Sequence, residues 1–319
     1  MIKAENITKR YGMRAAVSGI SFEVGDGEIV GFLGPNGAGK STTMNILTGY
    51  IAPTSGTVEI DGHDILTDTI AAKQSIGYLP EQPPLYPEMT VREYLEFVYE
   101  LKGCTLNRKK HIEDVMNVTK VQDVADRVIK NLSKGYKQRV GIAQAIVGDP
   151  KTVILDEPTI GLDPKQIIEI RNLIRILGRE HAVILSTHIL SEVQAVCDRL
   201  IVINKGQIVA DERTEDITRA VDGSRRLQTM ICGPAKDVYS AIRAMDGVVR
   251  VDQMAGNDLD STTYVIESAP GVDIRRDLFK LTCDNNWPII GLENKTMDLE
   301  HVFIALTGEK GAKKKALRK

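Results

Sequence analysis

The chain has 319 residues and a mass of 35.1 kDa, a length that predicts two or three domains. With 42% apolar residues, 26% charged residues and a formal net charge of −2, the composition excludes wholesale disorder and a global basic field for nucleic acid. Four cysteines without a CxxC pair argue against a zinc ribbon and a disulfide scaffold. Because the chain has no apolar run of about 18 residues and no N-terminal signal pattern, we expect neither a membrane span nor export by the usual signal.

The first 212 residues alternate between short apolar runs and longer stretches with apolar residues at helical spacing. Residues 2–24 and 57–60 predict antiparallel strands, and the prolines between Pro80 and Pro87 predict a loop. Doubly buried strands are predicted at Ile29–Leu33, Thr152–Leu155, Ala182–Ser186 and Leu200–Ile203, and helices at Lys40–Leu47, Lys137–Val147 and Lys165–Leu177. This order predicts an α/β domain with a parallel core sheet, flanking helices and an added antiparallel β layer.

The remaining residues predict a second, smaller domain. The domain boundaries that we expect are 1–212 for the first domain, 213–226 for a polar linker, 227–309 for the second domain and 310–319 for a basic tail. Strands and helices in the second domain are expected in the order βαββαβ, which is the ferredoxin-like α+β pattern, followed by a helix near Leu299–Leu306. The tail holds six Lys or Arg residues and no acid, so it is either solvated or in contact with anionic lipid headgroups.

A phosphate-binding loop follows the strand at Ile29–Leu33. The motif GxxxxGK[ST] needs glycines because a Cβ would block the backbone N–H groups that turn toward phosphates. The lysine adds a cation for the β- and γ-phosphates, and the serine hydroxyl is placed to bind Mg²⁺. The residues predicted to bind nucleotide here are Gly34, Pro35, Asn36, Gly37, Ala38, Gly39, Lys40, Ser41 and Thr42.

Two acids end the apolar strand that begins at Thr152. The carboxyl ends of parallel strands are where such sheets bind ligands, so Asp156 and Glu157 are expected beside the phosphate loop. Asp156 would hold Mg²⁺ through its hydration shell, and Glu157 would polarise the attacking water.

Further motifs resemble those of ABC-type ATPases. Leu132-Ser-Lys-Gly-Tyr-Lys-Gln-Arg-Val140 resembles the LSGGQ signature, Gly161-Leu-Asp-Pro164 resembles the D-loop, and Ser186-Thr-His188 resembles the strand end that carries the switch histidine. Tyr11 stands where the family places an aromatic residue against adenine. The motifs follow the family's order over residues 1–212 and resemble the ATP-binding subunits of bacterial export-type and gliding-type transporters, many of which carry an additional C-terminal domain.

The resemblance assigns roles to individual residues. It implies a P-loop fold with a helical subdomain, catalytic roles for Lys40, Glu157 and His188, and contacts to ATP from Tyr11, Ser133, Gly135 and Asp163. Lys134 replaces the usual first glycine of the signature. The metal-facing residue of the Q-loop is either Glu81 or Gln82.

The resemblance also implies partners and a location. The signature of one ABC subunit serves the ATP of another, so we expect a second copy of this chain or a paralogous ATPase subunit to complete the site. The cofactors are expected to be ATP and Mg²⁺, and the partners integral membrane permease subunits, with no nucleic acid and no direct membrane insertion. The expected location is the cytoplasmic face of the plasma membrane. The alternative is a soluble ABC ATPase that acts on a ribosome or a nucleic-acid complex.

Overall fold

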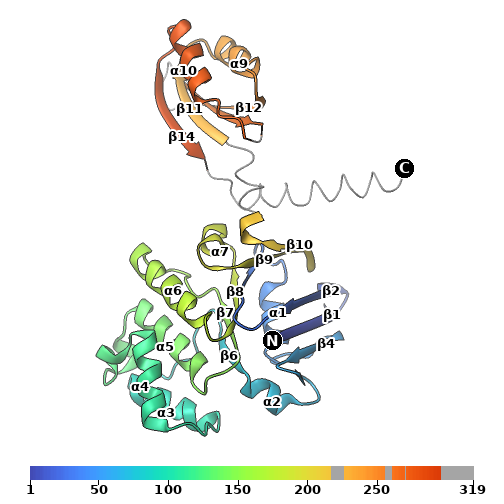
Figure 1. Ribbon diagram of the computed structural model, residues 1–319, viewed down its shortest axis with the longest axis vertical. Helices are drawn as coiled ribbons and strands as arrows, with labels where there is room; N and C mark the ends of the chain where they lie inside the picture. Colours follow the sequence, from blue (N-terminus) through green and yellow to red (C-terminus); the bar gives the residue numbers. More distant parts are fainter. Residues whose placement is uncertain (217–225, 256–260, 270, 296–319) are drawn as a thin grey trace. The chain divides into compact units, whose positions relative to one another are not determined.

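The structure is a computed structural model that describes residues 1–216, 226–255, 261–269 and 271–295 (Figure 1). Two compact units divide the chain at Thr214, Met1–Thr214 and Glu215–Lys319. The predicted helix near Leu299–Leu306, the predicted basic tail 310–319 and residues 217–225 of the predicted linker lie outside the described residues.

Two sheets form the first unit. An antiparallel sheet has the order β2-β1-β4-β5, and a six-stranded sheet has the order β10-β9-β3-β8-β7-β6, in which every pair is parallel except β9 with β10. The strands are β1 (Ile2–Tyr11), β2 (Arg14–Val24), β3 (Ile29–Leu33), β4 (Ser55–Ile60), β5 (His63–Asp64), β6 (Ile76–Leu79), β7 (Thr152–Asp156), β8 (Ala182–Thr187), β9 (Arg199–Asn204) and β10 (Gln207–Arg213). The α/β fold with an antiparallel layer is therefore confirmed.

Helices α3, α4 and α5 lie together beside the core sheet and form the predicted helical subdomain (Figure 1). The helices of this unit are α1 (Lys40–Leu47), α2 (Thr69–Gln74), α3 (Val91–Leu101), α4 (Arg108–Thr119), α5 (Lys134–Ile146), α6 (Pro164–Leu177) and α7 (Leu190–Val196), with short 3-10 helices at Gln122–Val124 and Ile129–Asn131. Thr90 caps α3 through a capping box with Glu93. The predicted helix Lys137–Val147 was wrong at its start, because Ser133 caps α5 one turn earlier.

One apolar core lies between the two sheets of this unit. Strands β3, β7 and β8 are buried along their whole length, as expected for central strands of a parallel sheet. Their inward side chains meet Ile2, Ile7 and Val17 of the antiparallel layer in a single cluster with Met44 and Leu47 of α1.

The described part of the second unit contains a four-stranded antiparallel sheet in the order β12-β13-β11-β14 and two helices. Its elements are β11 (Arg226–Cys232), α9 (Ala235–Arg243), β12 (Val248–Ala255), β13 (Ser261–Ser268), α10 (Arg275–Asp284) and β14 (Ile289–Lys295). The predicted βαββαβ order is confirmed, and Ile231, Ile242 and Tyr264 belong to a core of this unit alone. The ends of the predicted linker 213–226 need correction, because Arg213 closes β10 and Arg226 opens β11.

Candidate functional site

The carboxyl ends of four neighbouring strands meet at one edge of the core sheet. Leu33 of β3 pairs with Thr187 of β8, and Asp156 of β7 pairs with Ser186 of β8. Since β6 lies beside β7, the chain that leaves β6 toward Glu81 starts at the same edge. The topology therefore brings the phosphate loop, His188, Glu157 and Glu81 together, although they are far apart in the sequence.

Glycines shape the phosphate loop between β3 and α1. Gly37 has φ 77° and Gly39 has φ 112°, both in the left-handed half of backbone space that favours glycine. A Cβ on Gly39 would lie 2.7 Å from the carbonyl oxygen of Ala16. Among the described residues no side chain caps the start of α1 at Lys40, so its first N–H groups are available to an anion.

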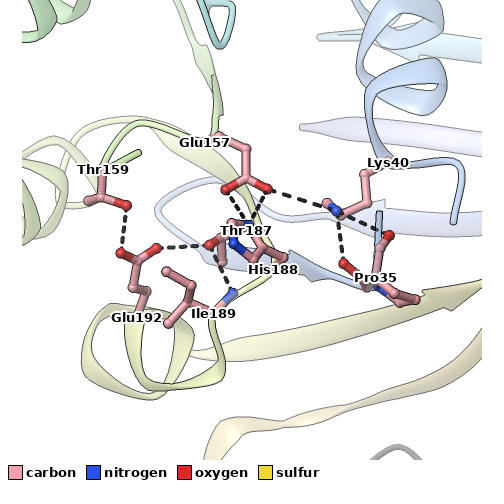
Figure 2. Close-up of polar contacts among 9 residues, drawn as sticks. Pro35, Lys40, Glu157, Thr159, Thr187, His188, Ile189 and Glu192 are labelled. Carbon is pink, nitrogen blue, oxygen red and sulfur yellow. Dashed lines mark hydrogen bonds and ion pairs between the residues drawn. The ribbon is translucent and has the colours of Figure 1, made fainter. Parts of the chain in front are cut away.

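Lys40 is a buried cation between the loop and the acids. Its Nζ donates hydrogen bonds to the carbonyl oxygens of Gly34 at 2.8 Å and Pro35 at 3.4 Å (Figure 2). It also lies 3.8 Å from Oε1 of Glu157. Burial lowers the pKa of Lys40, while the carboxylates of Glu157, Asp156 and Glu81 act in the opposite direction.

Glu157 and His188 form a hydrogen-bonded pair. Nδ1 of His188 lies 3.0 Å from each carboxylate oxygen of Glu157 (Figure 2). An ionised carboxylate can only accept, so Nδ1 of His188 is the donor in this pair. Glu157 is 7% exposed and has φ 49°, a conformation that costs about 1–3 kcal/mol for a non-glycine residue and is found at functional sites.

Asp156 is suited to a metal ion. It is 3% exposed, and its Oδ1 has no hydrogen-bond partner among the described residues. Burial raises the pKa of Asp156, and the nearby hydroxyls of Ser186 and Ser41 act in the opposite direction. A buried carboxylate oxygen without a partner is costly, and a cation would satisfy it.

A cleft of about 990 Å³ opens over these groups. It is lined by Tyr11, Arg14, Ala15, Ala16, Asn36, Gly37, Gly39, Lys40, Ser41, Thr42, Glu81, Glu157, Ile160, His188 and Lys205. Glu81 lines the cleft and Gln82 does not, so the geometry favours Glu81 for the position that the sequence left open. Tyr11 is 55% exposed, and Nζ of Lys9 lies 5.6 Å from its ring centroid.

The cleft lining does not include six of the predicted nucleotide-binding residues: Gly34, Pro35 and Ala38 of the phosphate loop, and Ser133, Gly135 and Asp163 from later in the chain. Ser133 caps α5, with its hydroxyl accepting from the N–H of Tyr136 at 3.4 Å, and Asp163 caps α6 in the same way for Gln166 at 2.9 Å. Gly135 is buried and packs closely against the side chain of Gln166. A Cβ at this position would lie 2.6 Å from the amide carbon of that side chain. Within one subunit, the starts of α5 and α6 are therefore held together away from the cleft.

The structure adds site residues that the sequence analysis missed. Lys205 and Gly206 form the two-residue turn between β9 and β10, with φ 47° and 76°, and the N–H of Gly206 donates to the carbonyl of Ala38 in the phosphate loop at 2.8 Å. The Lys-Gly pair between two apolar runs was the signal for this turn. Glu192 on α7 is 2% exposed and accepts from Thr159 and Thr187 (Figure 2). Nothing in the sequence indicates that this acid is buried.

A second hollow lies beside the loop 80–87. It has a volume of about 530 Å³ and is lined by Asn45, Tyr50, Ile76, Tyr78, Pro80, Pro84, Lys102, Gln144 and Ala145. Tyr86 is 54% exposed, and its ring packs against Phe97 at a centroid distance of 5.4 Å. Leu85 and Met89 are half-buried, so only part of the apolar surface of this loop is free.

Comparison with known proteins gives the family. A family profile described as ABC transporter matches residues 17–160. Linearmycin resistance ATP-binding protein LnrL of Bacillus subtilis (strain 168) is 32% identical over 310 residues, which cover 97% of this chain and 98% of the relative. The chain belongs to the ATP-binding proteins of ABC transporters.

Other relatives and solved structures agree with this assignment. Bacitracin transport ATP-binding protein BcrA of Bacillus licheniformis is 32% identical, covering 86% of this chain and 91% of its own. A solved dimeric ATP-binding cassette in a post-hydrolysis state with ADP and phosphate is 28% identical with a TM-score of 0.61, covering 67% of this chain and 99% of that structure. The chain is therefore an ATP-hydrolysing transporter subunit of a type that dimerises, and the ribosome or nucleic-acid alternative is not favoured.

Among the described residues, no helix is both long enough and apolar enough to span a membrane.

Proposed function

We propose that this chain hydrolyses Mg²⁺-ATP in the cleft at the carboxyl edge of the core sheet, and that hydrolysis drives transport through separate membrane subunits. The observation that supports the catalytic part is the convergence of Lys40, Glu157 and His188, with contacts of 3.8 Å and 3.0 Å to the same carboxylate. These are a cation, a base and a donor that orients the base, which phosphoryl transfer to water requires.

Each residue has one task in the proposed reaction. Lys40 and the first N–H groups of α1 bind the β- and γ-phosphates, and Tyr11 stacks on adenine. Glu157 accepts a proton from the attacking water while the oxygen of that water forms a bond to the γ-phosphorus. The bond to the oxygen bridging the β- and γ-phosphates breaks, leaving ADP and inorganic phosphate. His188 keeps the Glu157 carboxylate oriented through its Nδ1–H.

The metal would be held by Ser41 and Asp156, with Glu81 as the third oxygen donor at the cleft. Mg²⁺, when bound, neutralises charge on the phosphate oxygens. The test is steady-state phosphate release by the purified chain with ATP, measured with Mg²⁺ and again with excess EDTA. Turnover that EDTA leaves unchanged would contradict a magnesium-dependent reaction.

The partners follow from where the remaining residues lie. Ser133, Gly135 and Asp163 are outside the chain's own cleft, so we propose that they contact the ATP of a second copy or of a paralogous subunit.

The hollow between Tyr50, Tyr78 and Pro84, together with exposed Tyr86, is an apolar surface of the kind that receives a partner, and we propose a segment of a membrane subunit there. This docking would hold the chain at the cytoplasmic face of the plasma membrane. BcrA is named for bacitracin transport and a Burkholderia orbicola relative for Nod factor export, which supports an export-type subunit.

A further inference from the structure

Glu192 is a buried carboxylate that the roles proposed above do not use. It lies in the first turn of α7 and is 2% exposed. Its Oε1 accepts from the hydroxyl of Thr159 at 2.6 Å and its Oε2 from the hydroxyl of Thr187 at 2.8 Å. Among the described residues no cation pairs with it. A carboxylate in such a place costs several kcal/mol unless it is hydrogen-bonded, so the two hydroxyls are essential partners.

The two hydroxyls belong to the segments that carry the catalytic pair. Thr159 follows Glu157 by two residues, and Thr187 directly precedes His188. The hydroxyl of Thr187 also accepts from the N–H of Ile189 at 3.2 Å, so the chain is held on both sides of His188. Figure 2 shows Glu192 between these two segments, on the side of His188 away from Lys40.

We infer that Glu192 is a positioning residue for ATP hydrolysis: it ties the segment after Glu157 to the segment before His188 and so maintains the contact between them. The backbone of Glu157, with φ 49°, persists only if its surroundings hold it, and the hydrogen bond at Thr159 is one such constraint. A shift of about 1 Å in a catalytic group can lower the rate about 100-fold. This inference rests on the proposed function of Glu157 and His188.

The first test separates turnover from binding. Glu192→Ala should lower kcat about 10- to 100-fold, while KM and the affinity for ATP stay within about twofold, because Lys40 and the phosphate loop are not contacted by Glu192. Glu192→Gln, which keeps the shape and at least one hydrogen bond, should recover part of the loss. Gln194→Ala, an exposed change on the same helix, is the matched control and should retain wild-type kcat. A wild-type kcat for Glu192→Ala would overturn the inference, as would a loss confined to ATP affinity.

The second test is a double-mutant cycle with His188. If Glu192 acts through His188, Glu192→Ala should lower kcat much less in the His188→Ala background than it does in the wild-type chain. If the fold loss in kcat of the double variant equals the product of the two single losses, Glu192 does not act through His188. Should Glu192→Ala fail to fold, Thr159→Val removes the hydrogen bond from Thr159 to Glu192 at nearly constant shape and enters the same cycle with the same criteria. A wild-type chain without ATP turnover would refute the proposed function itself, whereas an active wild type with an equally active Glu192→Ala refutes only this inference.

Discussion

At the scale of single residues, the position of Glu157 is fixed by its contacts and by its backbone conformation. Its carboxylate contacts a buried cation on one side and the imidazole of His188 on the other. Its backbone is left-handed, and its N–H donates to the carbonyl of Ser186 on β8 at 2.9 Å. Charge, backbone and neighbouring strand therefore all constrain where this acid points, as a general base requires.

Replacing Glu157 by Gln should lower kcat about 10²–10⁴-fold and leave ATP binding nearly unchanged, because the amide keeps the shape and loses the proton acceptor. Lys40→Ala is the contrasting variant and should weaken ATP binding itself. Phosphate release and equilibrium binding of a fluorescent ATP analogue would measure the two effects. Wild-type turnover in Glu157→Gln would show that another group activates the water.

At the scale of elements, α5 joins two surfaces of the first unit. Its start carries Ser133 and Gly135, and its end lines the hollow beside the loop 80–87 through Gln144 and Ala145. Lys102, which follows α3, caps the end of α5, since its Nζ donates to the carbonyls of Ala145 at 3.0 Å and Val147 at 2.7 Å. A cation at a helix C-terminus is favourable, whereas its burial is not.

Burial lowers the pKa of Lys102 to about 8 from 10.5, which makes its contribution to stability depend on pH. Between pH 8 and pH 10.5 the unfolded chain binds more protons at Lys102 than the folded chain does. The contribution of Lys102 to the free energy of unfolding therefore rises with pH across this range, and it is lost as the pH falls through about 8. Lys102→Met should therefore lose stability relative to wild type as pH rises from 8 toward 10.5. Thermal unfolding over this range would measure the difference. Lys109→Met, at an exposed lysine of α4, should show a constant difference, and a constant difference for Lys102→Met would contradict the assigned burial effect.

The loop 80–87 and α3 form the surface on which we expect the membrane subunit. Tyr86→Asp should leave the ATPase activity of the isolated chain nearly unchanged and should abolish co-sedimentation with membranes that contain the partner, because it places a charge in an apolar contact. Val118→Asp adds the same charge on α4 and serves as the control. Membrane association that survives Tyr86→Asp would exclude this loop as the docking surface and leave the family assignment intact.

At the scale of the whole molecule, each of the two units has its own apolar core. The residues that we propose as catalytic, Lys40, Glu157 and His188, all belong to the first unit. Within the described part of the second unit, no residue carries a role in the proposed reaction. The similar solved cassette that holds ADP and phosphate is a dimer.

ATP should drive this chain into a dimer when hydrolysis is blocked. Glu157→Gln with Mg²⁺-ATP should double in mass by size-exclusion chromatography with light scattering, because two nucleotides join two complementary surfaces. Ser133→Arg in the same background should remain a monomer, since a bulky cation would fill the space for the γ-phosphate. Ser240→Arg, at an exposed position of α9, is the control and should still dimerise. A single mass under every nucleotide condition would count against the composite site.

Local patterns were sufficient for much of the fold. The strand Ile29–Leu33 and the helix Lys40–Leu47 have the predicted bounds, because an uninterrupted apolar run and a glycine-rich turn define both ends. Strand β10 was not predicted, and its last three residues, Asp211, Glu212 and Arg213, are polar. They form an edge strand held by backbone pairing with β9, which periodicity does not report.

The sequence by itself determined the phosphate loop, the two acids at the end of β7 and the family, because each depends on residue types at short, defined spacings. Only the tertiary structure decided that Glu81 rather than Gln82 lines the cleft and that Lys205 reaches it from another turn. It alone revealed that Glu192 is buried between Thr159 and Thr187. Burial and proximity arise when distant strands end at one edge of a sheet, and no local pattern encodes which side chains will then face each other.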